Sequence, residues 1–312
     1  MQPLAFDELA TGLQFPEGPV AMPDGSIVLV EIARGTLSRV TPDGRIHVVA
    51  KLGGGPNGAA PGPSGKIYVT NNGGFDWVRL KDGRIFPSTQ PADYIGGRIQ
   101  VVDPESGRFE TLYDACDGRG LRGPNDLVFD GAGGFWFTDL GKTRSRDQDR
   151  GAVYYARADG SKIEEKVFPL ERPNGIGLSP DGRSLYVAET PTARLWAFDL
   201  SAPGEIRSAD GPYRGEKGRV VAGLGGYQFF DSLAVDGAGH ICVATLISGC
   251  ISDIAPDGSR VVQYALPDQM VTNLCFGGDG LRTVFATLSM GGRLVRATWP
   301  RPGLALAHTS PP

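Results

Sequence analysis

Short apolar runs separated by glycine-containing turns recur along the whole chain. The stretch PNGIGLSPDGRSLYVAE, which begins at Pro173, shows the pattern well, with two apolar runs flanking a Pro-Asp-Gly turn. Pro, Asp and Gly favour tight turns, and short β-branched or aromatic runs on either side favour strands. The stretch therefore predicts a β-hairpin that opens at the polar residue Asn174 and closes at the carboxylate Glu189.

Five other stretches repeat this arrangement, so the hairpin is a unit of a larger structure. In five of the six copies the closing residue follows the opening residue by 14 positions, and in the copy at Asn174 the spacing is one longer. The opening residues are Glu17, Asn57, Asn125, Asn174, Asp231 and Asn273. The closing residues are Glu31, Asn71, Asp139, Glu189, Thr245 and Thr287.

A third strand pattern, and usually a fourth, follows each hairpin. The units begin at intervals of 40, 68, 49, 57 and 42 residues, and four-stranded repeats of this length are typical of propeller blades. The last unit has three strands, and the N-terminal segment LAFDELATG supplies a fourth. We predict an all-β fold for residues 1–312, a single six-bladed β-propeller with four-stranded blades whose last blade is closed by the N-terminal strand. A β-solenoid is the alternative, although its repeats would be shorter.

In a propeller the first strand of each blade lines the central channel, so the opening residues should form a polar collar around one mouth of it. The closing residues should form a second ring on the same face. Two carboxylates facing four amides would repel each other unless a cation lies between them. Oxygen ligands without thiolates favour one divalent ion, Ca²⁺ above all, with Mg²⁺, Mn²⁺ or Zn²⁺ as alternatives. The simpler interpretation is that the Asn residues satisfy backbone groups where strands begin.

Four of the segments carry a resemblance to a known family. FPEGP at 15, GPNDLVFDGAGGFWFTDLG at 123, RPNGIGLSPDGRSLYVAET at 172 and FFDSLAVD at 229 resemble the SMP-30/gluconolactonase/luciferin-regenerating-enzyme-like family. The resemblance implies a six-bladed propeller with one catalytic divalent metal that mostly hydrolyses lactones of sugar acids. Related calcium propellers hydrolyse organophosphates.

The resemblance also implies roles for individual residues. Glu17, Asn174 and Asp231 match the metal ligands, and Asn125 matches either a fourth ligand or a substrate-binding amide. The animal branch has an Arg two residues before this Asn, whereas this chain has Gly123 there, so the sugar contacts of that branch are not carried over.

The reaction would rest on the metal and on carboxylates. The three histidines, at positions 47, 240 and 308, fall in an outer strand, a turn at the far end of a blade and the C-terminal tail. A triad built on histidine is therefore not expected. We assign Asp231 as the general base that activates water, with a nucleophilic role as the alternative. The predicted substrate-binding residues are Asn57, Asn71, Asn125, Asp139, Glu189 and Trp77.

Two long loops should lie on the face that carries the collar. Residues 72–97 include Phe75, Trp77, Phe86 and Tyr94, and could form a lid over the site. Residues 140–150 carry four basic residues, among them Lys142, which could attract an acidic substrate or form a solvated charged loop. The aromatic residues next to Asp231, Phe229 and Phe230, could line a pocket or pack between blades.

Composition narrows the class of protein further. The net charge of −4 and the absence of basic runs argue against a nucleic-acid partner. No apolar run approaches the roughly 20 residues that span a bilayer, and the N-terminus lacks a signal-peptide pattern. The four cysteines form no CxxC pair. We expect a cytoplasmic protein, a monomer or small homo-oligomer, that acts on a small-molecule lactone. A phosphotriesterase-like calcium propeller and a non-catalytic binding propeller are the competing functions.

Overall fold

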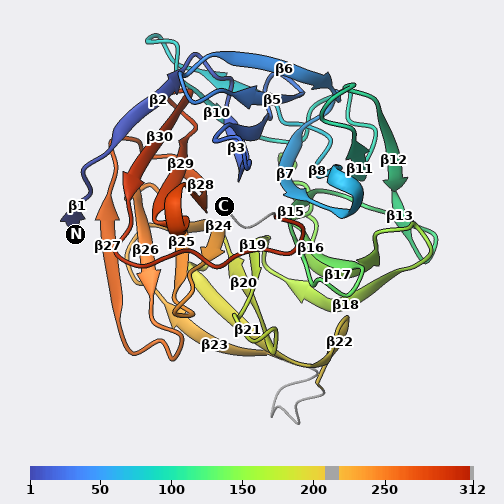
Figure 1. The fold of residues 1–312 in the computed structure, drawn as a ribbon. Coiled ribbons are helices and arrows are strands. Elements are labelled where there is room, and N and C mark those ends of the chain that lie inside the picture. Colours follow the sequence, from blue (N-terminus) through green and yellow to red (C-terminus); the bar gives the residue numbers. More distant parts are fainter. Residues whose placement is uncertain (208–217, 310–312) are drawn as a thin grey trace.

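The computed structural model describes residues 1–207 and 218–309, and these form a ring of six small sheets around a central channel (Figure 1). The all-β, six-bladed propeller predicted from the sequence is confirmed. Helical structure in the described part of the chain is limited to two short 3-10 turns, η1 (Pro63–Gly65) and η2 (Asp279–Leu281). No helix among these residues is long and apolar enough to cross a membrane.

The first three blades follow one another along the chain, each running from the channel outward. Blade 1 contains β3 (Pro16–Ala21), β4 (Ile27–Glu31), β5 (Thr36–Val40) and β6 (Ile46–Lys51). Blade 2 contains β7 (Pro56–Pro61), β8 (Ile67–Asn71), β11 (Arg98–Val102) and β12 (Phe109–Tyr113). Blade 3 contains β15 (Pro124–Phe129), β16 (Gly134–Asp139), β17 (Gly151–Arg157) and β18 (Ile163–Leu170). Between blades 2 and 3 lies a two-stranded ribbon of β13 (Ala115–Cys116) and β14 (Arg119–Gly120).

The last three blades complete the ring. Blade 4 contains β19 (Pro173–Leu178), β20 (Ser184–Glu189), β21 (Arg194–Ala202) and β23 (Gly218–Gly223), with β22 (Glu205–Ile206) beside β21. Blade 5 contains β24 (Phe229–Val235), β25 (Ile241–Leu246), β26 (Cys250–Ile254) and β27 (Val261–Ala265). Blade 6 contains β28 (Val271–Gly277), β29 (Thr283–Leu288) and β30 (Arg293–Thr298).

The N-terminal segment closes the ring by pairing with two blades. The strand β2 (Asp7–Thr11) runs antiparallel to β30, which makes it the predicted fourth strand of blade 6. A second pairing was not predicted: β1 (Gln2–Pro3) runs parallel to β27 and adds a fifth strand to blade 5. The segment thus joins the last two blades, and covers the outer edge of each.

The first strand of every blade contains a break in its pairing register near the opening residue. In β3 the break falls between Glu17 and Val20, and in β19 between Pro173 and Ile176. Such irregularities re-aim side chains and are common beside functional sites. The same break occurs in β7, β15, β24 and β28. The opening side chains of all six blades therefore depart at equivalent positions from the regular alternation of side chains between the two faces of the strand.

The glycine that follows several opening residues permits close contact between blades. A Cβ atom at Gly175 would lie 2.5 Å from the backbone nitrogen of Leu233 in blade 5, and one at Gly18 would lie 2.7 Å from that of Ala59 in blade 2. Neither contact involves a flexible side chain that could move away. The Asn-Gly pair at 174–175 therefore combines a collar residue with the small residue that lets neighbouring inner strands approach.

We predict that Gly175→Ala destabilises the protein by about 1–3 kcal/mol, because the added methyl overpacks the interface between blades 4 and 5. Urea unfolding followed by circular dichroism measures the change. The control is Gly225→Ala, where a Cβ would meet nothing within 4 Å and the change should stay within about 0.5 kcal/mol. Equal stabilities for both variants would show that the inner strands tolerate a wider spacing.

Candidate active site

The four predicted metal ligands lie together at one mouth of the channel. Glu17 belongs to β3, Asn125 to β15, Asn174 to β19 and Asp231 to β24, so each comes from the first strand of a different blade. Their exposed fractions are 2%, 3%, 5% and 8%. The ring symmetry brings these residues together although up to 214 positions separate them along the chain.

Hydrogen bonds fix the direction of these side chains. The Asn174 amide donates to Thr190 Oγ1 at 3.2 Å, which leaves its Oδ1 atom 3.4 Å from Ser232 Oγ. Ser232 Oγ also lies 3.5 Å from Glu17 Oε1. The other carboxylate oxygen of Glu17 accepts from Asn273 Nδ2 at 2.6 Å. The Ser232 hydroxyl therefore links the side-chain oxygens of Glu17 and Asn174, and the Asn273 amide holds the second carboxylate oxygen of Glu17.

Hydroxyl groups from neighbouring blades hold the backbone of the collar. Thr138 Oγ1 donates to the carbonyl of Asn174 at 2.6 Å, and Thr70 Oγ1 donates to the carbonyl of Asn125. Ser289 Oγ makes the equivalent contact to the carbonyl of Pro16, at 2.5 Å. Each of these bonds is buried and crosses from one blade to the next. The position of a collar residue thus depends on the packing of two blades.

Three carboxyl groups share this buried region, and burial raises the pKa of each. Burial raises the pKa of Asp231 to about 8. Repulsion by Asp126 also raises this pKa, whereas the hydrogen bond from Asn174 lowers it. Burial also raises the pKa of Asp126 to about 7. The pKa of Glu17 rises well above its ordinary value through burial and through the repulsion of Asp231 and Asp126. The site therefore concentrates negative charge that the surrounding protein compensates only in part.

The donor set fits a hard divalent cation. Two carboxylates and two amide oxygens are the groups that Ca²⁺ prefers, and Asn125 Oδ1 is buried without a hydrogen-bond partner. Such orphaned acceptors are rare, and a cation can satisfy one as well as a donor can. Among the residues that the structure describes, no three His, Cys, Asp or Glu side chains converge as a metal-binding group, so amides would have to complete the ligand set.

The closing residues lie on the same face, but their polar atoms hold the loops between blades. Asp139 accepts the amides of Arg122, Gly123 and Gly141 at 2.7–2.9 Å. Glu189 accepts the amide of Glu171 at 2.8 Å.

Asn71 makes similar contacts: it accepts the amide of Gly55 at 3.0 Å and donates to the Gly53 carbonyl at 2.8 Å. The side chains of Asn71, Asp139 and Glu189 thus have structural partners, which leaves few of their polar atoms for the substrate contacts predicted for them.

Of the remaining predicted substrate-binding residues, Asn57 belongs to the collar and Trp77 to the loop of residues 72–97, here called the lid loop. Asn57 occupies its predicted place in the collar, at the start of β7, and is 5% exposed. Trp77 belongs to a hairpin within the lid loop, formed by β9 (Trp77–Arg79) and β10 (Ile85–Pro87). Its ring packs against Phe15 and Phe75 with centroids 5.1 and 6.2 Å away, so the hairpin rests on the segment that leads into Glu17.

The second loop is joined to the lid through a buried lysine, so it is not simply the solvated charged loop that the sequence allowed. Lys142 is 2% exposed, and its ammonium lies 4.2 Å from the ring centroid of Phe75 and 5.3 Å from that of Tyr94. It donates to the Gly74 carbonyl at 2.5 Å and to Asn72 Oδ1 at 3.4 Å.

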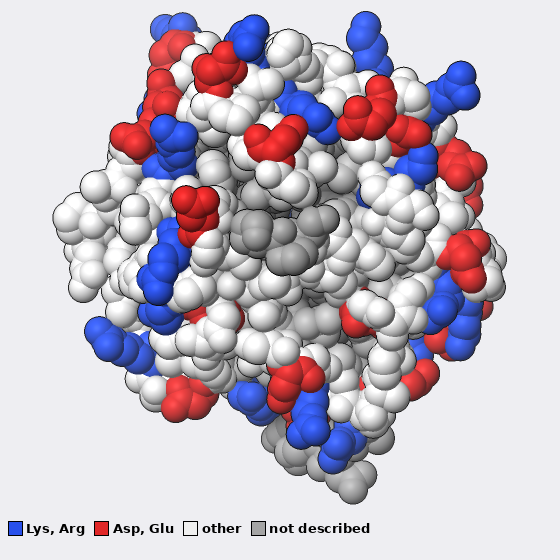
Figure 2. Space-filling view, viewed as in Figure 1, with Lys and Arg blue, Asp and Glu red and all other residues white. Residues whose placement is uncertain are grey.

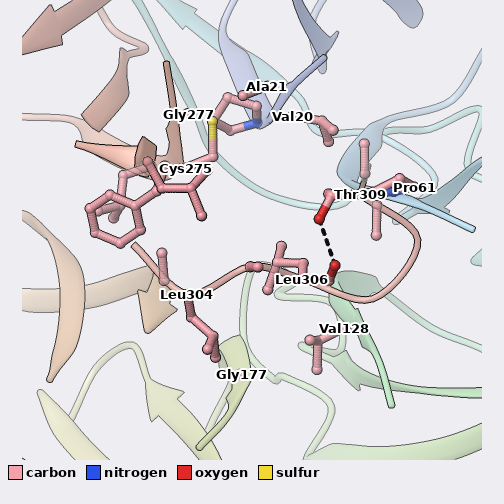
Figure 3. Close-up of a pocket in the computed structure, with 18 of the residues that line it drawn as sticks. Val20, Ala21, Pro61, Val128, Gly177, Cys275, Gly277, Leu304, Leu306 and Thr309 are labelled. Carbon is pink, nitrogen blue, oxygen red and sulfur yellow. Dashed lines mark hydrogen bonds between the residues drawn. The ribbon is translucent and has the colours of Figure 1, made fainter. Parts of the chain in front are cut away.

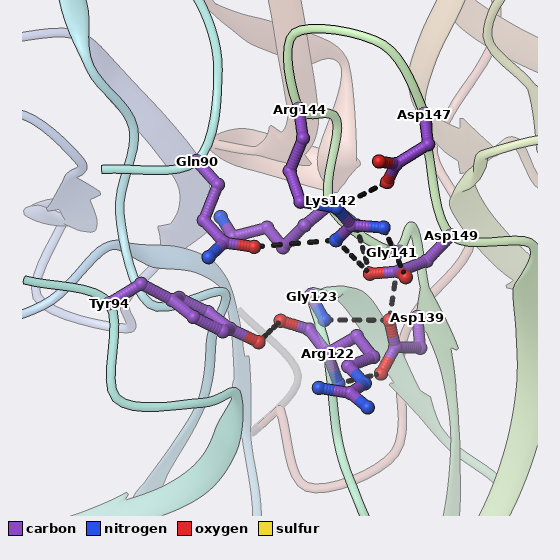
Figure 4. A network of polar contacts seen from close by, with 10 residues as sticks. All are labelled: Gln90, Tyr94, Arg122, Gly123, Asp139, Gly141, Lys142, Arg144, Asp147 and Asp149. Atoms are coloured by element: carbon purple, nitrogen blue, oxygen red, sulfur yellow. Dashed lines mark hydrogen bonds and ion pairs between the residues drawn. The ribbon is translucent and has the colours of Figure 1, made fainter. Parts of the chain in front are cut away.

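Other polar contacts tie the same loops together (Figure 4). Gln90 accepts from Arg144 at 3.4 Å, and Arg144 in turn pairs with Asp149 at 2.8 Å. Tyr94 donates to the Arg122 carbonyl at 2.5 Å. The two long loops therefore form one layer above the collar on the side of blades 2 and 3.

The three histidines lie away from the collar, as expected. His47 is in the outermost strand of blade 1, His240 hydrogen-bonds Asp253 at 2.8 Å, and His308 packs on Phe129 at the far end of β15. Of the aromatic residues beside Asp231, Phe230 is fully buried between blades, whereas Phe229 pairs with the exposed Tyr227. Hence Phe230 is a core residue.

Below the collar, an apolar cavity of about 260 Å³ occupies the channel. Its wall includes Val20, Pro61, Val128 and Cys275 from the inner strands, and it reaches upward to Asp126 (Figure 3). The segment from Leu304 to Thr309 lines the opposite end and crosses the centre of the ring in Figure 1. On that face Figure 2 shows charged side chains spread around the rim. The C-terminal segment thus narrows the channel behind the site.

Comparison with known proteins identifies the family. The family described as "SMP-30/Gluconolactonase/LRE-like region" matches residues 15–290. The chain belongs to this family. A gluconolactonase of Zymomonas mobilis is 27% identical over 91% of this chain and 79% of its own length. A diisopropyl-fluorophosphatase of Loligo vulgaris is 30% identical over 65% of this chain and 66% of its own.

A solved structure with low sequence identity shares the fold. The structure of a calcium-binding protein, regucalcin, from Agrobacterium tumefaciens superposes with a TM-score of 0.74 at 20% identity, over 98% of this chain and 99% of that one. At this level of identity the likeness supports the propeller architecture alone. The family membership rests on the match over residues 15–290.

The fold brings to the site three residues that were not predicted from the sequence. Asp126 and Ser232 each follow an opening residue and contribute a buried carboxyl and a buried hydroxyl beneath the collar. Arg172, two residues before Asn174, interacts electrostatically with Asp231. A signal for the first two was present, because the equivalent position is Gly at 18, 58 and 175 but polar here.

We predict that Lys142 makes the stability of the protein rise with pH above 7. Burial, together with repulsion by Arg172, lowers the pKa of Lys142 from 10.5 to about 7. Attraction by Asp139 and Asp149 opposes this shift only in part. Between these values the unfolded chain binds a proton that the folded chain lacks, so the free energy of unfolding gains up to about 1.4 kcal/mol per pH unit. In Lys142→Met this contribution disappears. Urea unfolding at pH 6.5, 7.5 and 8.5 should show the advantage of the variant over wild type shrinking as pH rises.

The control for this measurement is Lys162→Met, at a lysine whose side chain is 57% exposed. A difference between Lys142→Met and wild type that is the same at all three pH values would contradict the prediction. So would an equal pH trend in the two lysine variants.

Proposed function

We propose that this protein is a metal-dependent lactonase that opens the ring of a sugar-acid lactone of the gluconolactone type. The observation that carries the proposal is the buried convergence of Glu17, Asn125, Asn174 and Asp231, with an orphaned amide oxygen among them, in a chain of the SMP-30/gluconolactonase-like family. Relatives named gluconolactonase and lactonase support the reaction class.

The four collar residues would hold one divalent ion, most suitably Ca²⁺. When bound, such an ion polarises a carbonyl oxygen and lowers the pKa of a bound water. The protein contributes the geometry. Ser232 and Asn273 orient Glu17, and Thr190 turns the oxygen of Asn174 toward the same space. Burial of the collar keeps bulk water away from the reacting groups.

Asp231 is the residue best placed to move a proton. Asn174 hydrogen-bonds its carboxyl group, and Arg172 favours its ionised form. In the proposed reaction this carboxylate takes a proton from water, the oxygen of that water adds to the lactone carbonyl carbon, and the ring C–O bond breaks. The proton passes to the alkoxide that leaves, so the product is a hydroxy acid. With all described histidines remote from the collar, Asp231 has no imidazole competitor for this role.

A second function has a specific observation in its favour. A relative that is 30% identical over 65% of this chain is named diisopropyl-fluorophosphatase, and a metal held by carboxylates and amides could polarise a phosphoryl oxygen as readily as a carbonyl oxygen. Rates on glucono-1,5-lactone, an aromatic lactone and a dialkyl fluorophosphate, measured with Ca²⁺ present, distinguish the two. A preference for the sugar lactone supports our proposal, and absence of turnover on all three would favour a binding propeller.

We predict that the two collar carboxylates are needed to retain the metal. Glu17→Gln and Asp231→Asn each remove one negative charge from the donor set while keeping its shape, so both should lose divalent metal on dialysis together with lactonase activity. Elemental analysis and a lactone assay measure these effects. Asp147→Asn, at an exposed loop carboxylate, is the control and should change neither. Full metal content in both collar variants would remove the metal hypothesis.

We also predict that Asp231 does more than bind metal. In Asp231→Asn assayed at saturating Ca²⁺, kcat for the lactone should stay lower by about 10²–10⁴-fold, because one positioned general base typically contributes that factor. Glu17→Gln under the same conditions should recover more of its activity, since we assign Glu17 only a ligand role. Recovery of Asp231→Asn to near the wild-type rate would make Asp231 a ligand only.

A further inference from the structure

Arg172 is held in an unusual backbone conformation at the edge of the site. It lies between β18 and β19, two residues before Asn174, and its φ angle is 51°. Residues other than glycine seldom adopt this left-handed region, and when they do they cluster at functional sites. Its carbonyl accepts the amide of Thr190, the same residue that orients the Asn174 side chain. The position of Arg172 is thus coupled to that of a predicted metal ligand.

Among the described residues, the guanidinium of Arg172 has no ion-pair partner, unlike those of its neighbours Arg150 and Arg144. Arg150 pairs with Glu171 at 2.8 Å, and Arg144 pairs with Asp149 at 2.8 Å. In the part of the chain that the structure describes, no hydrogen bond or ion pair within 4.0 Å involves the guanidinium of Arg172. A partly buried guanidinium carries five donors and cannot lose its proton, so it favours an anionic partner.

Asp231 does not fill this role. It interacts with Arg172 electrostatically but forms no ion pair with it, and as a proposed metal ligand its charge is already committed. Lys142 is buried near enough for its protonated form to repel Arg172, and burial lowers the pKa of this lysine to about 7. Lys142 itself is enclosed by Asn72, Gly74 and Phe75, whereas Arg172 retains partial exposure. Arg172 is therefore the one that a ligand can reach.

We propose that Arg172 binds an acidic substituent of the substrate, a carboxylate or sulfonate carried away from the lactone carbonyl. This inference rests on the proposed lactonase function, since it assigns the substrate class of the same site. In the proposed reaction the lactone carbonyl oxygen binds at the collar. The guanidinium of Arg172, at the same mouth of the channel, can then bind a negatively charged group elsewhere on the substrate. Arg172 is a specificity residue and takes no part in proton transfer.

Two lactones of the same ring size test the proposal. D-Glucono-1,4-lactone is neutral, and D-glucaro-1,4-lactone carries a carboxylate in place of the terminal hydroxymethyl group. With Ca²⁺ present, the wild type should show the higher kcat/KM for the acidic lactone. Arg172→Gln should lower that value by about 10–100-fold, chiefly through KM, since hydrogen bonds to charged groups have this effect. The variant should change the value for the neutral lactone by less than about twofold.

Arg150→Gln is the matched control, because Arg150 is exposed, already paired and near the same loop. It should leave both lactones unaffected. Equal losses on the two lactones in Arg172→Gln would mean that Arg172 acts on the ring carbonyl or on folding, and would overturn the proposal. So would no loss on either lactone. Thermal melts of each variant distinguish a folding defect from a specific one.

Binding measurements separate this inference from the proposed function. If the wild type opens neither lactone, the lactonase proposal fails, and calorimetry with D-glucarate and D-gluconate still decides the role of Arg172. Tighter binding of glucarate that depends on Arg172 would support the anion site. Equal affinities for the two acids, or a preference unchanged in Arg172→Gln, would reject it.

Discussion

The burial of three carboxyl groups in one region is the constraint on which the site depends. Glu17, Asp126 and Asp231 come from three blades; burial raises the pKa of each, and repulsion between carboxylates adds to the rise for Glu17 and Asp231. The protein offers partial compensation through Asn273, Ser232 and backbone amides. The site gathers buried acidic groups and also leaves the amide oxygen of Asn125 without a partner. A bound cation would offset the unfavourable burial of negative charge and would also satisfy the unpaired oxygen.

The propeller supplies the rigidity that such a site needs. Hydroxyls of one blade hold the carbonyls of the next, as Thr138 holds Asn174, and glycine at 18 and 175 lets the inner strands approach. The closing residues complete this arrangement from above, since Asp139 and Glu189 bind the loop amides that lead into the collar. Above them the loop of residues 72–97 and the loop of residues 140–150 meet at Lys142.

Much of the fold could be predicted because it repeats. A fixed spacing of 14 residues between opening and closing positions identified the hairpins, and the incomplete last unit indicated the closure by β2. The additional pairing of β1 with β27 could not be foreseen, since a two-residue strand has no pattern of its own. Asp126 and Ser232 were overlooked for a related reason: at the position after an opening residue, a single polar residue looks like an ordinary part of a strand.

By itself, the sequence determined the strands, the number of blades and the identity of the collar residues, because these follow from local patterns that recur six times. The tertiary structure alone decided which polar atoms are free. Asn71, Asp139 and Glu189 resemble collar residues in sequence, yet loop amides occupy much of their hydrogen-bonding capacity, whereas Asn125 Oδ1 and the Arg172 guanidinium have no such partners. Hydrogen bonding and charge compensation depend on distances between segments remote in the chain, and only the closed ring fixes those distances.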